Sequence, residues 1–108
     1  MHSGRISPGV VLNLRNMVEY GEDAVVSRIL VKSPTGSVTL FAFDEGQELS
    51  EHSTPYDALV QVVDGSGHFT TAGVEHAVEA GEAILLPANV PHAVKASSRF
   101  KMVLTMLR

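Results

Sequence analysis

The chain has 108 residues, 44% of them hydrophobic and 19% charged, which indicates a single globular domain over residues 1–108 and excludes disordered and fibrous proteins. Eight Lys and Arg against twelve Asp and Glu give a formal net charge of −4, so nucleic acid and anionic membranes, which require a basic face, are not expected as partners. No cysteine is present, which excludes disulfides and thiolate metal sites.

Short β-rich runs follow one another along the chain, each bounded by Gly, Pro, Asp or Asn. Strands are expected at residues 24–31, 37–43, 58–63, 68–71, 74–78, 83–86, 92–95 and 100–107. Turns or loops are expected between them, at residues 32–36, 44–46, 64–67, 72–73, 80–81 and 87–91. Only residues 13–20 suggest a helical turn, and no apolar stripe has the 3.6-residue period of a helix. Short strands at about 8–12-residue spacing predict an all-β sandwich or barrel.

A first glycine-anchored segment carries a histidine in a defined spacing. It runs Gly46, five residues, His52, one residue, Thr54, three residues, Ala58, six residues and Gly65. This order resembles the first motif of the cupin superfamily, which has a second histidine and a glutamate at positions 54 and 58. Residues two apart on a strand share a face, so we expect His52 and Thr54 both to point into the barrel.

A second segment resembles the second cupin motif. It runs Gly81, five residues, Pro87, one residue, Asn89, two residues, His92, three residues and Ala96. Asn89 and Ala96 stand where the family has Gly and Asn, and Asn tolerates a positive φ better than most residues. Because both motifs occur in the family's order and span about half of the chain, the protein is identified as a member of the cupin superfamily, of the small single-domain type.

The resemblance implies a double-stranded β-helix, the jelly-roll barrel, with a metal site inside it. In the family, positions 52, 54, 58 and 92 hold three histidines and a glutamate around a divalent metal, often zinc, iron, manganese or nickel. We expect position 58 to face the interior from the strand after His52, and His92 to enter from the opposite sheet. Asp57 should point away from the interior by strand alternation. Only His52 and His92 therefore remain as metal ligands.

The candidate pocket consists of His52, Thr54, Tyr56, Ala58 and His92. The two imidazoles either bind a divalent metal weakly or are a metal-free pair bonded to water or to Thr54. Thr54 donates its hydroxyl to a ligand or bonds a neighbouring backbone group. Tyr56 lines the barrel mouth as an acid or base, or else closes the loop beside Pro55. Thr54 and Ala58 in place of His and Glu leave a more apolar cavity, of the kind that binds small organic molecules.

The remaining residues of interest have simpler expected roles. His68 or His76 would raise the number of metal ligands to three only if its side chain turned inward. His2 lies in a terminal segment and counts little as a candidate ligand. Glu82 is expected to stabilise a turn. Six apolar residues are expected to pack the interior or a dimer face, namely Phe41, Phe43, Val60, Val62, Leu85 and Leu104. Met102 and Met106 are expected in the core rather than in a cofactor site.

Three classes of function follow. The first is a small-molecule-binding barrel with a weakly held divalent metal as an option, and the second is a metal-dependent oxygenase, isomerase or hydrolase acting on a small metabolite. The third is an interaction role, in which residues 10–14 pair across a two-fold axis of a homodimer. No apolar run approaches the about 20 residues that span a bilayer, and residues 1–5 lack the apolar stretch of a signal peptide, so a cytoplasmic protein is expected.

Overall fold

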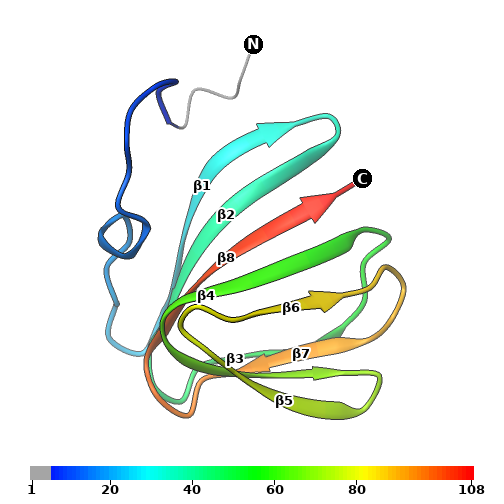
Figure 1. Ribbon diagram of the computed structural model, residues 1–108. Coiled ribbons are helices and arrows are strands. Elements are labelled where there is room, and N and C mark those ends of the chain that lie inside the picture. Colours follow the sequence, from blue (N-terminus) through cyan, green and yellow to red (C-terminus); the bar gives the residue numbers. More distant parts are fainter. Residues whose placement is uncertain (1–5) are drawn as a thin grey trace.

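The computed structural model describes residues 6–108, which form two antiparallel sheets sharing one long strand (Figure 1). The strands are β1 (Val25–Ser33), β2 (Gly36–Phe43), β3 (Glu48–His52), β4 (Asp57–Thr71), β5 (Val74–Glu79), β6 (Ala83–Leu86), β7 (His92–Lys95) and β8 (Phe100–Leu107). The first sheet has the order β1-β2-β8-β4-β6, and the second has the order β5-β4-β7-β3. The predicted all-β jelly-roll class is confirmed.

Strand β4 joins the two sheets, because its first half pairs with β6 and β8 and its second half with β5 and β7. The turn predicted at residues 64–67 is therefore wrong, since the strand continues through it. Gly65 has a φ of +72°, and a Cβ there would collide with the carbonyl oxygen of Arg99. Gly67 lies against the ring of Phe100, which also leaves no room for a side chain. These glycines permit a bend and a close approach rather than a chain reversal.

Apolar side chains fill the space between the sheets. Ala58, Val60 and Val62 are buried along the first half of β4, whereas Gly67 and Phe69 are buried along the second half. The inward positions thus change from even to odd numbers, because the register between β4 and β8 shifts between Val62 and Asp64. The other members of this core are Phe43, Val78, Leu86, Val94, Ala96, Phe100 and Met102, with Phe41, Leu104 and Met106 packed against it. The residues expected in the interior lie there, except Leu85, which is 53% exposed; the alternative expected for Leu85, a dimer face, stays a prediction.

The N-terminal segment, residues 6–24, lies over the outer face of the first sheet on the side of β1 and β2 (Figure 1). A second apolar cluster forms there from Val18, Leu30, Leu40, Ala42 and Val103. The helical turn expected over residues 13–20 is reduced to one 3-10 turn, Leu14–Asn16. Within residues 6–108 no helix is long and apolar enough to cross a membrane.

Polar contacts hold this segment where the two sheets meet. The Tyr20 hydroxyl donates to Asp64 Oδ2 at 2.7 Å, and the Lys101 ammonium lies 4.8 Å from the Tyr20 ring centroid. Burial, and then the bond to Asp64, raise the pKa of Tyr20 above its usual range. Arg99 Nε donates to Asp44 Oδ1 at 2.7 Å and holds the pKa of that carboxyl below its usual range. The contacts of Tyr20 fasten the segment to β4 and β8.

The other turns follow the sequence signals. The hairpin between β4 and β5 has positive φ at Ala72 (50°) and Gly73 (79°), as an inverse two-residue turn requires. The loop at residues 87–91 has Asn89 at a φ of 63°, which confirms the tolerance expected of Asn. Glu82 Oε1 accepts the Glu79 N–H at 2.9 Å, so its turn-stabilising role is confirmed as well. His2 lies outside the described residues.

The bend of β4 predicts a difference between two glycine substitutions. Gly73 also has a positive φ, but its added Cβ would meet nothing within 4 Å. Gly73→Ala is expected to lower the free energy of unfolding by about 1 kcal/mol, the backbone cost alone. Gly65→Ala adds a collision with Arg99 and should cost at least about twice as much. Chemical denaturation of both variants measures this, and equal losses would contradict the close approach at Gly65.

Candidate functional site

An extra residue in β3 determines the position of His52. In the pairing of β3 with β7, Leu49 lies opposite Val94 and His52 lies opposite His92. Three steps along β3 therefore match two steps along β7, which is a β-bulge. Leu49 packs against the core, so alternation alone would turn position 51 inward and place Glu51 opposite His92. The bulge instead directs His52 to the face that His92 occupies.

His52 and His92 consequently form a close pair of rings. The ring centroids are 4.4 Å apart and the planes meet at 68°, an edge-to-face arrangement. His92 is 6% exposed, whereas His52 is exposed, so the pair extends from the surface into the interior. The expectation that the two histidines converge is confirmed. The expectation that His92 enters from the opposite sheet is wrong, because β7 is the neighbour of β3 in the same sheet.

Backbone carbonyls determine which nitrogen of each ring carries the proton. His52 Nδ1 lies 2.8 Å from the carbonyl oxygen of Ser50, and His92 Nδ1 lies 3.3 Å from that of Val90. A carbonyl oxygen can only accept, so each Nδ1 carries a hydrogen and donates it. Each Nε2 of the neutral rings therefore has a free lone pair. The site thus offers two such lone pairs, on rings whose centroids are 4.4 Å apart.

Burial keeps His92 in its neutral form. Desolvation, followed by repulsion from His52, lowers the pKa of His92, while the bond to Val90 opposes this change. The pKa of His92 thus lies below its ordinary value of 6.5, and at neutral pH its Nε2 is a hydrogen-bond acceptor.

Thr54 and Tyr56 belong to the loop between the sheets and not to a strand. Strand β3 ends at His52, so the prediction that Thr54 shares its strand face is wrong. The Thr54 hydroxyl donates to the carbonyl of Tyr56 at 3.1 Å and lies 3.4 Å from the Tyr56 amide, which confirms the simpler backbone role. The Thr54 carbonyl accepts the Asn89 N–H at 2.7 Å and so joins the two loops that flank the histidines. The Tyr56 ring lies 5.0 Å from the Arg108 guanidinium carbon.

Ala58 faces the interior, as expected, but it is 4% exposed and packed in the main core, where it pairs across the first sheet with Leu86 and Met106. Thr71 lies directly opposite His92 in the second sheet, so the two side chains share the inward face. Sequence reasoning missed Thr71, because only the register of β4 against β7 brings it to the site.

The other titratable side chains remain apart from the pair. His68 Nδ1 lies 3.7 Å from Glu75 Oε1. His76 is exposed on β5, which β4 separates from β7. Asp57 is exposed, as expected, and its Oδ1 accepts the Ala88 N–H at 2.8 Å.

The donor set does not match that of a tightly bound metal. Across residues 6–108 no group of three or more His, Asp or Glu side chains is placed to hold an ion. A catalytic zinc site normally has three protein ligands, and the non-haem iron triad includes a carboxylate. Two imidazoles without a carboxylate therefore do not fit the four-ligand centre that the cupin motifs describe.

Comparisons with known proteins agree on the family. The family described as Cupin domain matches residues 39–107. A conserved protein of unknown function from Streptococcus pyogenes is 35% identical, with a TM-score of 0.90 over 96% of this chain and 91% of that one. A cupin 2 conserved barrel domain protein from Leptotrichia buccalis is 42% identical, with a TM-score of 0.87 over 90% of this chain, which spans 47% of that protein.

A further similar structure is a cupin superfamily protein from Desulfitobacterium hafniense. It is 26% identical, with a TM-score of 0.88 over 95% of this chain and 94% of that one. No curated protein matches the chain.

The lowered pKa of His92 predicts a pH-dependent stability. Between the folded pKa and 6.5 the unfolded chain binds more protons than the folded chain, so the free energy of unfolding rises with pH there. The contribution of neutral His92 to the free energy of unfolding should be complete above pH 6.5. It should decrease as the pH falls from 6.5 to the folded pKa, and level off below that pKa. Denaturation of wild type and His92→Gln between pH 7.5 and 5 measures it. We expect a smaller slope in the variant, and parallel curves would show that His92 is not desolvated.

Proposed function

The chain belongs to the cupin family, and from this premise we propose that it binds a small molecule at the mouth of its barrel through His52 and His92. One observation supports the proposal above the others. The Nδ1 of each ring is engaged by a backbone carbonyl, which leaves the Nε2 of each ring for a ligand, and the two ring centroids are 4.4 Å apart. A ligand approaching from solvent meets the exposed His52 first and then the buried His92.

The chemistry of these lone pairs indicates the class of ligand. Neutral imidazoles with protonated Nδ1 present acceptors, so the ligand must offer hydrogen-bond donors such as hydroxyl or N–H groups. A carboxylate or phosphate would find no cationic partner in a neutral His92. We propose a small, neutral, hydroxylated organic molecule.

A weakly held divalent metal is the second candidate, favoured by the same two free Nε2 atoms, which are common metal-binding atoms of histidine. Water would complete its coordination, because the described residues bring no carboxylate or third imidazole to the pair. The metal-dependent enzyme is ranked below both, since the site lacks the donors that such chemistry normally uses.

The proposal predicts saturable stabilisation that depends on both histidines. Purified protein is heated with a panel of sugars, polyols and phenols over a range of concentrations. A ligand at 100 times its dissociation constant stabilises the folded state by about 2.7 kcal/mol, and the melting temperature should rise accordingly in wild type. His52→Ala and His92→Ala should both abolish the rise.

His68→Ala is the matched control, because His68 is paired with Glu75 away from the site, and it should retain the full shift. A shift that persists in both site variants would place binding elsewhere and refute the proposal. Elemental analysis of protein purified without chelator or affinity tag separates the candidates. Stoichiometric metal that disappears in both site variants would favour the metal over the organic ligand.

A further inference from the structure

Thr71, at the end of β4, belongs to the same row of side chains as the histidine pair. It lies directly opposite His92 in the pairing of β4 with β7, and His92 lies directly opposite His52 in the pairing of β7 with β3. Residues directly opposite in neighbouring strands share a face, so the three side chains cross the inward face of the second sheet in one line. The Cβ atoms of opposite residues are about 5 Å apart, so one bound group can contact two members of the row.

The hydroxyl of Thr71 is open to a ligand. Thr71 is half-buried, and its hydroxyl forms no hydrogen bond with any residue between 6 and 108. Across this part of the chain no fully buried side-chain oxygen lacks a partner, so the Thr71 hydroxyl must be reached by solvent. The Thr54 hydroxyl differs, because it is bonded to the backbone of Tyr56.

The backbone holds Thr71 beside His92 before any ligand arrives. Strand β4 ends at Thr71, and the next residue, Ala72, donates its N–H to the carbonyl of Pro91 at 3.2 Å. Pro91 directly precedes His92, so this bond joins the two strand ends that carry the hydroxyl and the imidazole. A ligand therefore meets side chains that are already in place, which lowers the entropic cost of binding.

Thr71 adds a hydrogen-bond donor to a pair that only accepts. Each Nε2 of the neutral imidazoles accepts, whereas a hydroxyl both donates and accepts. A ligand hydroxyl can donate to the His92 Nε2 and accept from Thr71 through the same oxygen. A single N–H group of an amide or an aromatic ring can donate to the Nε2 but has no lone pair left to accept from Thr71.

The row continues onto β5 with an apolar residue. Val74 lies directly opposite Thr71 and is 56% exposed. The order across the second sheet is thus valine, threonine, histidine and histidine. A molecule whose hydroxyl lies between Thr71 and His92 can rest its carbon atoms on Val74.

We propose that Thr71 is a ligand-binding residue that selects hydroxyl groups over N–H groups. One ligand hydroxyl donates to the His92 Nε2 and accepts from Thr71, and the carbon skeleton extends toward Val74. The inference rests on the proposed function and assigns its preference for alcohols and phenols to one side chain.

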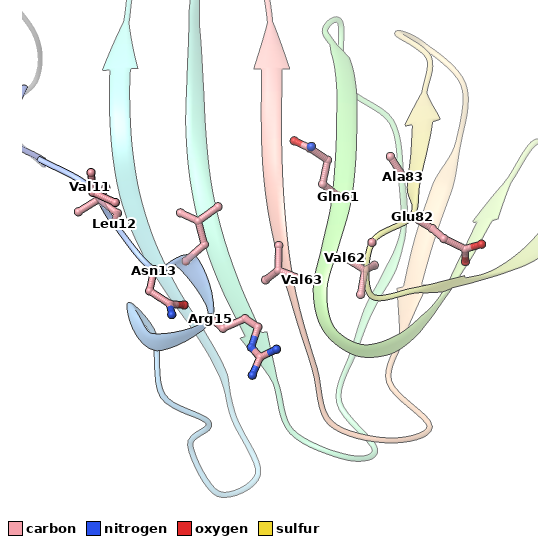
Figure 2. A pocket seen from close by; sticks show the side chains of 11 residues that line it. Val11, Leu12, Asn13, Arg15, Gln61, Val62, Val63, Glu82 and Ala83 are labelled. Atoms are coloured by element: carbon pink, nitrogen blue, oxygen red, sulfur yellow. The ribbon is translucent and has the colours of Figure 1, made fainter. Parts of the chain in front are cut away.

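A groove on another face is the alternative location for a small molecule. It has a volume of about 760 Å³ and is lined by Val11 of the N-terminal segment, Gln61 of β4 and Ala83 of β6 (Figure 2). Gln61 is an outward residue, because both of its neighbours in β4 are buried in the core. Binding in this groove would not depend on Thr71, which faces inward.

Titration of the protein with phenol and with pyrrole tests the selection. The phenol hydroxyl donates and accepts, whereas the pyrrole N–H only donates because its nitrogen lone pair belongs to the aromatic ring. Nuclear magnetic resonance shifts of the His52 and His92 ring signals give a dissociation constant for each probe. Thr71→Val, which keeps the shape of the side chain, should weaken phenol binding about fivefold by removing one neutral hydrogen bond, and should change pyrrole binding by less than about twofold.

Thr70→Val is the matched control, since Thr70 precedes Thr71 on β4 and points to the outer face, and it should leave both dissociation constants unchanged. Thr71→Ser retains the hydroxyl and should retain phenol binding. Equal phenol affinities of Thr70→Val and Thr71→Val, or equal losses of phenol and pyrrole in Thr71→Val, would overturn the role of Thr71 and leave the proposed function standing. No shift at His52 and His92 in wild type, or a shift at Gln61 in their place, would overturn both.

Discussion

One additional residue in β3, a β-bulge, determines which side chain lies beside His92. A regular strand alternates its faces strictly, so a regular β3 that points Leu49 into the core would present Glu51, an anion, to His92. The bulge presents the imidazole of His52 instead. A carboxylate beside a buried imidazole would favour its protonation, whereas a second imidazole lowers the pKa of His92. The neutral form of His92 is thus favoured by a local feature of the backbone.

A second backbone irregularity, in β4, also places side chains where a regular strand would not. The register shift in β4 moves the inward positions from even to odd numbers, and this keeps both halves of one strand facing a single core. Gly65 then allows β4 to pass close to Arg99, so that the two sheets meet there. The same region holds Asp44, Tyr20 and their partners, which fasten the N-terminal segment. The histidines lie at the ends of β3 and β7, beside the loops that cross between the sheets.

The sequence predicts most strands correctly because β-branched and aromatic runs end at Gly, Pro and Asn. Such a run predicts a strand at residues 100–107, and β8 has these bounds. The sequence predicts a turn at Gly65 wrongly, because a glycine that permits close packing looks the same in sequence as one that permits a turn. The convergence of His52 and His92 followed from the cupin motifs. The motifs do not predict the bulge, the place of His92 in the strand next to β3, or the position of Thr71 opposite His92. Strand register depends on contacts between distant segments, which the motifs do not contain.

The tautomers of the two imidazoles provide the most direct test of a site built from two free Nε2 atoms. Long-range proton–nitrogen correlation spectra at neutral pH distinguish protonated from unprotonated ring nitrogens. We predict that both His52 and His92 carry their hydrogen on Nδ1, with Nε2 unprotonated, and that protons of the two rings show a mutual nuclear Overhauser effect. Hydrogen on Nε2 of either ring, or no contact between the rings, would contradict this arrangement and remove the basis for a ligand site at the pair.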